Sequence, residues 1–264
     1  MNRVTNYKKL KLDIVDWISQ YVLQNPSIKS LVVGVSGGID SAVVSTLCAE
    51  TGLPTYVLSM PLYSSHDNDR LSDDHTKELE AKYPNVTRIR IELSGVYDKF
   101  VHSLNWWTDS NNYTSNELAN ANTKSRLRMV TLYQVAGSVN GIVVGTGNKV
   151  EDYGVGFYTK YGDGGVDIAP IADLYKTEVW ELGKELGVDQ RIINAPPTDG
   201  LWTDGRSDED QIGTSYEMLE WVMERGLSED PMFMSEKETL AINAYQKFNK
   251  QNKHKMLPIP TFKL

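Results

Sequence analysis

The sequence predicts an α/β fold built on a doubly wound parallel sheet with flanking helices. Short apolar runs that indicate strands alternate with stretches of helical periodicity. The runs at 31–35 and 141–146 contain no charged residue, as expected of strands that are buried in a parallel sheet. The 264 residues are 40% hydrophobic, which is enough to build one domain over 1–264.

The expected elements alternate along the chain. An amphipathic helix precedes the strand at 31–35, and a helix that begins at Ile39 follows it. Strands are also expected at 55–60 and 86–93, before the one at 141–146. The helix before the first strand covers 5–24, and the other expected helices cover 72–83, 95–104, 116–140, 173–186, 214–225 and 235–249. Three segments are expected to be loops, at 108–115, 147–170 and 195–213. The two longest loops are interpreted as lids, with plain surface loops as the alternative.

The helix expected over 116–140 is apolar on more than one side. Leu118 and Leu132 lie on one stripe, whereas Leu127 and Val130 lie elsewhere on the helical wheel. A helix with two apolar sides has to bury both of them. We therefore expect it to pack on its own sheet and against a second subunit, with packing inside a larger monomer as the alternative.

Charge and composition restrict the function classes. The formal net charge of -8 disfavours a nucleic-acid partner, because no compensating basic patch is visible. No apolar run is long enough to cross a membrane and no signal peptide is recognised, so a cytoplasmic protein is expected. The single cysteine, Cys48, lies among apolar helix residues, which favours a buried structural thiol over a nucleophile.

A glycine turn follows the first strand and opens the next helix. The residues are Ser36-Gly37-Gly38-Ile39-Asp40-Ser41, and glycine lets backbone N–H groups approach an anion at a helix N-terminus. An ordinary tight turn is the alternative. Since ligands bind at the carboxyl ends of parallel strands, Val35-Ser36 and Gly145-Thr146 are expected to face one crevice.

The pattern SGGxDS resembles the signature of the pyrophosphate-loop ATP enzymes, which split ATP between its α and β phosphates. That chemistry needs a cradle for pyrophosphate and a divalent metal that neutralises developing charge. The backbone of 36–41 is the expected cradle. Asp40 and Glu151 are the expected Mg²⁺ ligands, because Mg²⁺ prefers a few carboxylates together with phosphate oxygens. A helix-capping role for Asp40 is the alternative. Thr146, at a strand end, can also offer its hydroxyl or backbone to ATP.

Three cations lie among apolar or glycine-rich neighbours, namely Arg126, Lys160 and Lys176. Each is a candidate binding residue, with a solvated surface charge as the alternative. Lys160 is the strongest of them because it lies within the glycine-rich segment.

Longer segments resemble the NAD synthetase family specifically. The stretch at 145–179, GTGNKVEDYGVGFYTKYGDGGVDIAPIADLYKTEV, is similar to its central signature. Further similar segments occur in family order: NTKSRLRM, PPTDGLW, DEDQIGTSYEML and the pair His254-Lys255. The resemblance covers most of 31–256 and implies the short, ammonia-dependent form of the enzyme. It also implies an adenine nucleotide α-hydrolase-like fold, a Rossmann-like three-layer sandwich.

The implied reaction is a two-step amidation. The nicotinate carboxylate of deamido-NAD attacks the α phosphate of ATP, giving an adenylate and pyrophosphate, and ammonia then displaces AMP to give NAD. The substrate is itself the nucleophile, so no enzyme nucleophile is needed. The family resemblance further implies a homodimer, with the dinucleotide near the subunit interface.

The resemblance assigns roles residue by residue. Asp40 and Glu151 would hold Mg²⁺ and, with Lys176, form the catalytic set. The implied ATP-binding residues are Gly34, Val35, Ser36, Gly37, Gly38, Ile39, Asp40, Ser41, Thr146, Lys176 and Thr198. The implied deamido-NAD contacts are Arg126, Lys160, Asp167, His254 and Lys255.

The chain departs from the family pattern in three places. Gly147-Asn148-Lys149-Val150-Glu151 stands where many members have DHAAE, with the spacing from Thr146 to Glu151 kept. One more residue lies between Glu151 and Lys160 than in many members. Met256 replaces an arginine that often follows the His-Lys pair.

Two alternatives stay open. Another pyrophosphate-loop enzyme, such as a tRNA-modifying or glutamine-dependent amidating enzyme, would use the same loop. A tRNA-modifying enzyme would be expected to show reactive cysteines or a basic RNA surface. A non-catalytic nucleotide-binding module would not need carboxylates at both strand ends.

Overall fold

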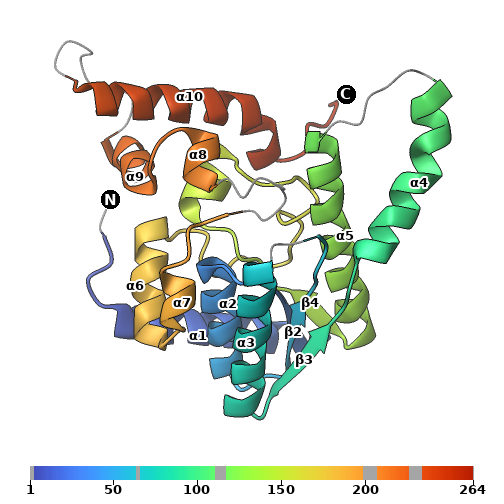
Figure 1. Cartoon of the computed structure of the whole chain (residues 1–264). Coiled ribbons are helices and arrows are strands. Elements are labelled where there is room, and N and C mark those ends of the chain that lie inside the picture. The colour runs from blue at the N-terminus through green and yellow to red at the C-terminus, as the bar shows by residue number, and fades with distance from the viewer. Residues whose placement is uncertain (1–2, 64–65, 111–116, 199–206, 226–233, 264) are drawn as a thin grey trace.

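The computed structural model describes residues 3–63, 66–110, 117–198, 207–225 and 234–263 (Figure 1). Among these residues lies a parallel sheet with the strand order β3-β2-β1-β4. Its strands are β1 (Ser30–Val35), β2 (Thr55–Ser59), β3 (Val86–Arg90) and β4 (Gly141–Val143). The predicted α/β fold with a parallel sheet is confirmed, and each predicted strand is present.

Strand β1 is central and buried on both faces. Leu31 and Val33 point into one core cluster, and Val32 points into the cluster on the opposite face. Strand β4 is shorter than predicted, because beyond Val143 only an isolated bridge joins Val144 to Ile168.

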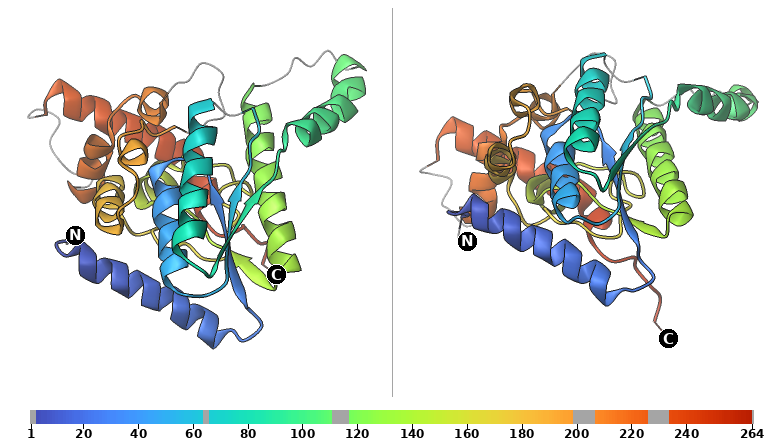
Figure 2. Two further views of the ribbon diagram at one scale, coloured as in Figure 1. Left: turned by 60° about the horizontal axis from the view of Figure 1, so that its bottom comes forward. Right: turned by 90° about the horizontal axis from the view of Figure 1, so that it is seen from below.

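Helices cover both faces of the sheet, as Figures 1 and 2 show. On one face, α2 (Ile39–Glu50) packs on β1, and α1 (Tyr7–Gln24) and α6 (Lys176–Leu186) pack against α2. On the same face α3 (His66–Lys82) covers β2 and β3. The opposite face is covered by α5 (Glu117–Ser138). The result is a three-layer arrangement.

Helix α4 (Ser94–Ser110) extends away from the body of the molecule (Figures 1 and 2). It is longer than the predicted 95–104. Residues 108–110, predicted as loop, belong to its end, because no proline or glycine stops the helix there. The rest of that predicted loop, 111–115, lies outside the described residues.

The two longest predicted loops, 147–170 and 195–213, both contain short helices. The π-helix η1 (Lys149–Val155) lies in the first, and α8 (Asp208–Ile212) lies in the second. At 7 and 5 residues they are too short to leave a periodic signal. The remaining helices are α7 (Gln190–Ile193), α9 (Tyr216–Arg225) and α10 (Glu236–Met256). Residues 199–206 of the second segment lie outside the described residues, so its role as a lid stays a prediction.

Helix α5 is apolar on two sides, as expected. Leu127 and Leu132 pack against the core of the sheet. Val130 is 58% exposed on the other side. Leu118, predicted on the stripe of Leu132, is 57% exposed and with Leu132 lines the cavity described below. The inner contact is confirmed, and an apolar side that faces outward remains available.

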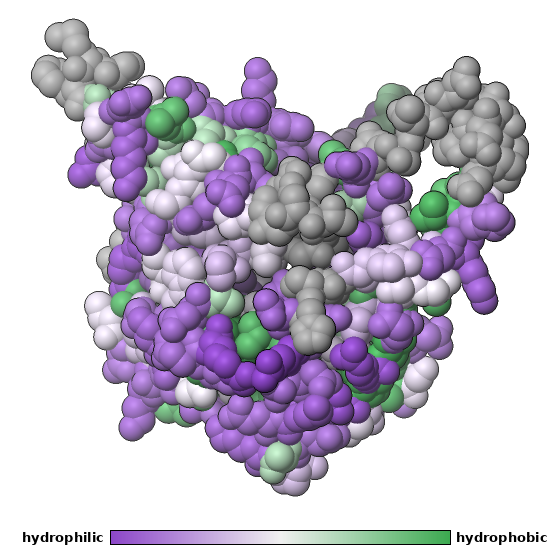
Figure 3. Space-filling model, viewed as in Figure 1, coloured by the Kyte–Doolittle hydropathy of each residue, from purple (hydrophilic) through white to green (hydrophobic). Residues whose placement is uncertain are grey.

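The outer surface is mainly hydrophilic in the view of Figure 3. Within the described residues, no helix combines the length and apolar character needed to cross a membrane. Cys48 is buried as predicted, and burial raises the pKa of its thiol. The thiol is therefore un-ionised at neutral pH and unreactive.

His75 provides a prediction about stability. Its Nε2 lies 3.0 Å from the Ser45 hydroxyl in a buried site, and burial lowers the pKa of the imidazole to about 4. The unfolded chain, with an ordinary histidine pKa, binds the proton more readily. The contribution of His75 to the free energy of unfolding is therefore fully present above about pH 6.5. It is lost as the pH falls toward 4, which lowers the free energy of unfolding by about 3 kcal/mol.

The measurement is urea unfolding of native protein and His75→Gln between pH 4 and 7.5. The native protein should lose more stability over the acidic range than the variant does. Identical pH slopes for the two proteins would contradict the assignment.

Candidate active site

A cavity of about 760 Å³ lies at the carboxyl edge of the sheet. Val35 and Ser36 line it where β1 ends, and Gly145 and Thr146 line it beyond β4. The prediction that both strand ends face one crevice is confirmed. The predicted site residues on its walls are Gly34, Val35, Ser36, Gly37, Gly38, Ile39, Asp40, Ser41, Thr146, Glu151, Lys176, Thr198, Arg126, Lys160, His254 and Lys255.

The glycine turn is held open by two serines. The Ser41 hydroxyl donates to the Gly38 carbonyl at 2.9 Å and accepts from the Ser36 N–H at 3.1 Å. Gly37 has a φ of +92°, and a Cβ built there would lie 2.5 Å from the backbone oxygen of Asn68. Only glycine fits this close approach. The turn leads into the N-terminus of α2, which favours an anion.

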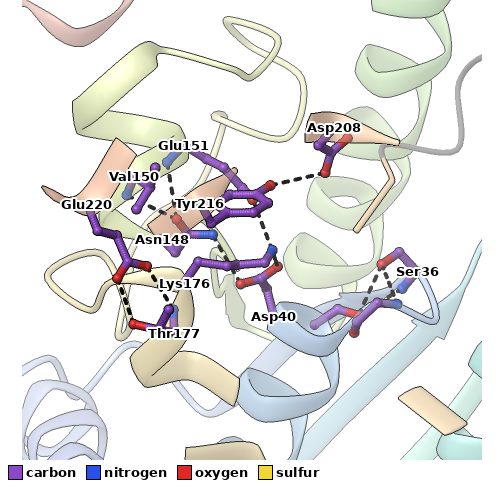
Figure 4. Close-up of polar contacts among 12 residues, drawn as sticks. Ser36, Asp40, Asn148, Val150, Glu151, Lys176, Thr177, Asp208, Tyr216 and Glu220 are labelled. Carbon is purple, nitrogen blue, oxygen red and sulfur yellow. Dashed lines mark hydrogen bonds and ion pairs between the residues drawn. The ribbon is translucent and has the colours of Figure 1, made fainter. Parts of the chain in front are cut away.

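Three charged side chains meet beside this turn (Figure 4). The Lys176 ammonium donates to Asp40 Oδ2 at 2.5 Å and to Glu151 Oε1 at 2.9 Å. Asp40 is in the first turn of α2, Glu151 is in η1, and Lys176 begins α6. The fold thus brings together the three residues predicted to be catalytic, from positions far apart in the chain.

Two further residues position these carboxylates. Asn148 caps η1, since its Oδ1 accepts from the backbone N–H of Val150 and Glu151, and its Nδ2 donates to Asp40 Oδ1 at 3.2 Å. The Tyr216 hydroxyl, on α9, donates to Glu151 Oε1 at 2.6 Å. Asn148 therefore provides the local hydrogen bonds at the first departure from the family pattern.

Helix α6 is held in place at the residue after Lys176. The buried Glu220 on α9 accepts from the Thr177 N–H at 2.9 Å and from its hydroxyl at 2.7 Å (Figure 4). These bonds satisfy a free N–H at the helix start, where a carboxylate is also favoured by the helix dipole. They fix the place from which Lys176 extends.

The electrostatics keep the central cation charged. Burial alone would lower the pKa of Lys176, but Asp40 and Glu151 raise it above its ordinary value. Burial would raise the pKa of Glu151, but Lys176 and the Tyr216 hydroxyl lower it. The half-buried Asp152 carboxyl also lines the cavity, and desolvation with the neighbouring Glu151 raises its pKa well above the usual range.

The predicted dinucleotide contacts gather at another part of the cavity wall. Arg126 donates to the Lys160 carbonyl at 3.3 Å, and the Lys160 ammonium donates to the His254 carbonyl at 3.2 Å. Lys255 donates to the carbonyls of Gly156 and Tyr158. Helix α10 is thereby joined to the glycine-rich segment, with the Met256 side chain beside Gly156.

Asp167 is the exception among the predicted site residues. Its carboxylate accepts from the Val143 N–H at 2.8 Å and from the Tyr133 hydroxyl at 3.1 Å, and it is absent from the cavity wall. These bonds link β4 to α5. Its contact with substrate stays a prediction that the described cavity does not support.

Sequence reasoning did not select Asn148, Tyr216 or Asp152. A residue type that caps helices, placed just before Glu151, is a signal for Asn148. Tyr216 lies in the family-like segment DEDQIGTSYEML, but nothing local links it to Glu151, because only the packing of α9 against η1 brings the two together.

Tyr216→Phe tests the positioning of Glu151. The change removes the hydroxyl and keeps the ring within the core. A hydrogen bond to a charged group is lost, so kcat/KM should fall about 10- to 100-fold. Tyr153→Phe, in which the native ring is 55% exposed, is the control and should match native protein in steady-state assays. Equal activity of both variants would remove Tyr216 from the site.

Comparisons with known proteins identify the family of this chain. A sequence model described as NAD synthase matches residues 11–258. The NH(3)-dependent NAD(+) synthetase of Finegoldia magna is 36% identical, covering 95% of this chain and 94% of its own. That of Alkaliphilus oremlandii is 42% identical, with coverages of 83% and 86%.

A solved structure is also similar over its whole length. The NMN synthetase of Francisella tularensis superimposes with a TM-score of 0.85 at 30% identity, covering 99% of this chain and 100% of that one. The match in sequence extends across the glycine turn, the charged triad and α10. The chain therefore belongs to the NAD synthase family.

Proposed function

We propose that the protein is a C–N bond-forming ligase that amidates deamido-NAD to NAD with ammonia, using ATP and releasing AMP and pyrophosphate. This is the last step of NAD biosynthesis. The observation that carries the proposal is the cavity in which the glycine turn lies beside Asp40, Lys176 and Glu151. Family membership favours this activity over tRNA modification or glutamine-dependent amidation. One domain over 1–264 and a cytoplasmic location remain part of the proposal.

The chain's own residues divide the work. Backbone N–H groups of the turn and the start of α2 bind the pyrophosphate portion of ATP. The Lys176 ammonium supplies positive charge beside them. The substrate carboxylate attacks the α phosphate, and adenylation turns a poor acyl donor into one with a good leaving group. Arg126, Lys160 and Lys255 bind the dinucleotide nearby.

Asp40 and Glu151 are the proposed Mg²⁺ ligands. The structure fits this assignment, since the two carboxylates already converge on one cation. In the described part of the chain, no group of three or more histidine, cysteine or acidic side chains could hold a metal. Phosphate oxygens and water would therefore complete the ligand shell. When bound, Mg²⁺ would neutralise charge on the phosphates.

The test is a reaction containing protein, ATP, Mg²⁺, ammonium and deamido-NAD. Equal amounts of NAD, AMP and pyrophosphate are expected. Neither NAD nor AMP would form if the proposal is wrong. Glutamine in place of ammonium should give no NAD.

A second candidate substrate is the corresponding mononucleotide. The similarity to the NMN synthetase of Francisella tularensis favours testing it. The same adenylation and amidation would convert nicotinate mononucleotide to NMN. Comparing kcat/KM for the two carboxylates under identical conditions decides which one is preferred.

The nucleophile of the second step is proposed to be neutral ammonia. At a fixed, subsaturating concentration of total ammonium, the rate should rise with pH as ammonium deprotonates. Initial rates between pH 6.5 and 8.5, each with saturating ATP and deamido-NAD, provide the measurement. A flat profile would argue against free ammonia.

We also propose a homodimer. The exposed apolar surface of α5 at Val130 and Tyr133, which lie one turn apart, supports it. Light scattering of the purified protein should give twice the chain mass, and Val130→Glu should shift it toward the monomer. A native protein that remains monomeric at all concentrations would overturn this part.

A further inference from the structure

We propose that Lys176 fills the cation position between Asp40 and Glu151 in the ATP-free protein, so that the metal enters only together with ATP. This inference rests on the proposed metal ligands. It adds an order of binding and assigns Lys176 the role of an internal counter-ion that the arriving substrate displaces. It also predicts how the metal affinity of the free protein responds to a single side chain.

The geometry leaves little room for a second cation. The Lys176 ammonium contacts both carboxylates, at 2.5 and 2.9 Å, and its side chain is 2% exposed. The side chains of Asp40 and Glu151 are 17% and 16% exposed. Lys176 already holds Asp40 Oδ2 and Glu151 Oε1, one oxygen atom of each proposed metal ligand (Figure 4).

The surrounding hydrogen bonds hold the carboxylates, whereas among the described residues the Lys176 ammonium contacts its surroundings beyond the carboxylates only through the Tyr216 ring, whose centroid lies 5.1 Å away. Asn148 holds Asp40 from one side, and the Tyr216 hydroxyl holds Glu151 from another. The Lys176 ammonium, by contrast, donates its hydrogen bonds to these two carboxylates. A lysine side chain has a flexible four-carbon stem, so its end can change partners while α6 stays in place.

The net charge of Asp40, Glu151 and Lys176 favours the ammonium over a divalent ion in the ATP-free protein. Two carboxylates and one ammonium sum to a single negative charge, which attracts a divalent ion far less than two unpaired carboxylates do. A divalent ion placed on the same oxygen atoms would also repel the ammonium at short range. With no third acidic or histidine ligand in the described residues, the protein alone offers the metal little compensation.

ATP removes both obstacles at once. Its phosphates, bound at the glycine turn and the start of α2, provide oxygen ligands for the metal and an anionic partner for the displaced ammonium. Asp40, in the first turn of α2, lies next to that turn. ATP and metal should therefore strengthen each other's binding, as linkage requires.

The test measures Mn²⁺ binding to the ATP-free protein by electron paramagnetic resonance. Native protein should bind Mn²⁺ weakly at this site. Lys176→Met should bind it at least tenfold more tightly, and adding Glu151→Gln to that variant should abolish the gain. Lys184→Met is the charge-matched control, because Lys184 pairs with the exposed Glu181 on the same helix. It should bind Mn²⁺ as native protein does.

A second variant with a neutral side chain at position 176 provides the same test if the first does not fold. If Lys176→Met does not fold, Lys176→Gln replaces it. The melting temperature of the neutral variant should rise with added Mn²⁺, whereas that of native protein should not. This readout does not depend on activity.

Two negative results have different meanings. Metal-dependent ATP binding is measured by equilibrium dialysis of native protein, Asp40→Asn and Glu151→Gln. If that binding needs both carboxylates but Lys176→Met gains no Mn²⁺ affinity, the metal site is right and the counter-ion role of Lys176 is wrong. If that binding needs neither carboxylate, the proposed metal site fails and the inference fails with it.

Discussion

Replacing Asp40 by asparagine is expected to lower kcat/KM by about 10³-fold or more while the protein remains folded. The carboxylate is both a partner of Lys176 and a proposed metal ligand. An amide of the same shape can still accept from Asn148, but it carries no charge. Lys176 keeps Glu151 as its partner, so the site does not leave a buried cation alone. Release of pyrophosphate measures activity, and circular dichroism measures the fold.

Asp173→Asn is the matched control. Asp173 pairs with Lys149 at 2.7 Å, and its side chain is 96% exposed, so its loss should change activity less than twofold. Full activity of Asp40→Asn would remove this carboxylate from the metal site. A folded but inactive Asp173→Asn would show that the assay responds to any lost acidic residue.

Replacing Gly37 by alanine should cause the other large loss. A Cβ at this position would lie 2.5 Å from the Asn68 carbonyl oxygen and 3.2 Å from the Ser72 nitrogen, both of them backbone atoms. The φ of +92° adds strain of about 1–3 kcal/mol for any residue with a Cβ. The turn has to move away from α3, so ATP affinity should fall about 100-fold or more. Calorimetric titration with ATP measures the affinity, and urea unfolding measures the strain.

Gly52→Ala separates the two effects. Gly52 also has a positive φ, of +72°, but nothing lies within 4 Å of the Cβ position. The control should therefore lose stability through backbone strain and keep its ATP affinity. A Gly37→Ala variant that binds ATP as tightly as the control would show that the turn does not cradle phosphate.

The parts of the site that sequence predicts best are local. The turn at 36–41 joins a strand to a helix without interruption, so the motif itself specifies its place at the edge of the sheet. Asp40 and Glu151 come together because the strands that precede them are neighbours in a parallel sheet. Alternation of strands and helices was sufficient to predict this much.

The remaining parts depend on contacts that periodicity does not encode. Lys176 was predicted as a binding cation, but its pairing with both carboxylates arises from the packing of α6 against α2. Tyr216 reaches Glu151 only because α9 packs on η1. Asp167, predicted as a substrate contact, joins β4 to α5 in the structure, a contact that periodicity does not predict either.

The π-helix η1 has a consequence for how sequences of this kind change length. A π-helical turn closes each hydrogen bond over one residue more than an α-helical turn, so it can take up one inserted residue. The family pattern implies one residue more between Glu151 and Lys160 than in many members, and both residues line the cavity. The π-helix η1 offers a place for such a residue, and Asn249 and Asn252 of α10 hold its last carbonyls. An evolving chain can thus gain a residue beside its active centre without displacing either flank.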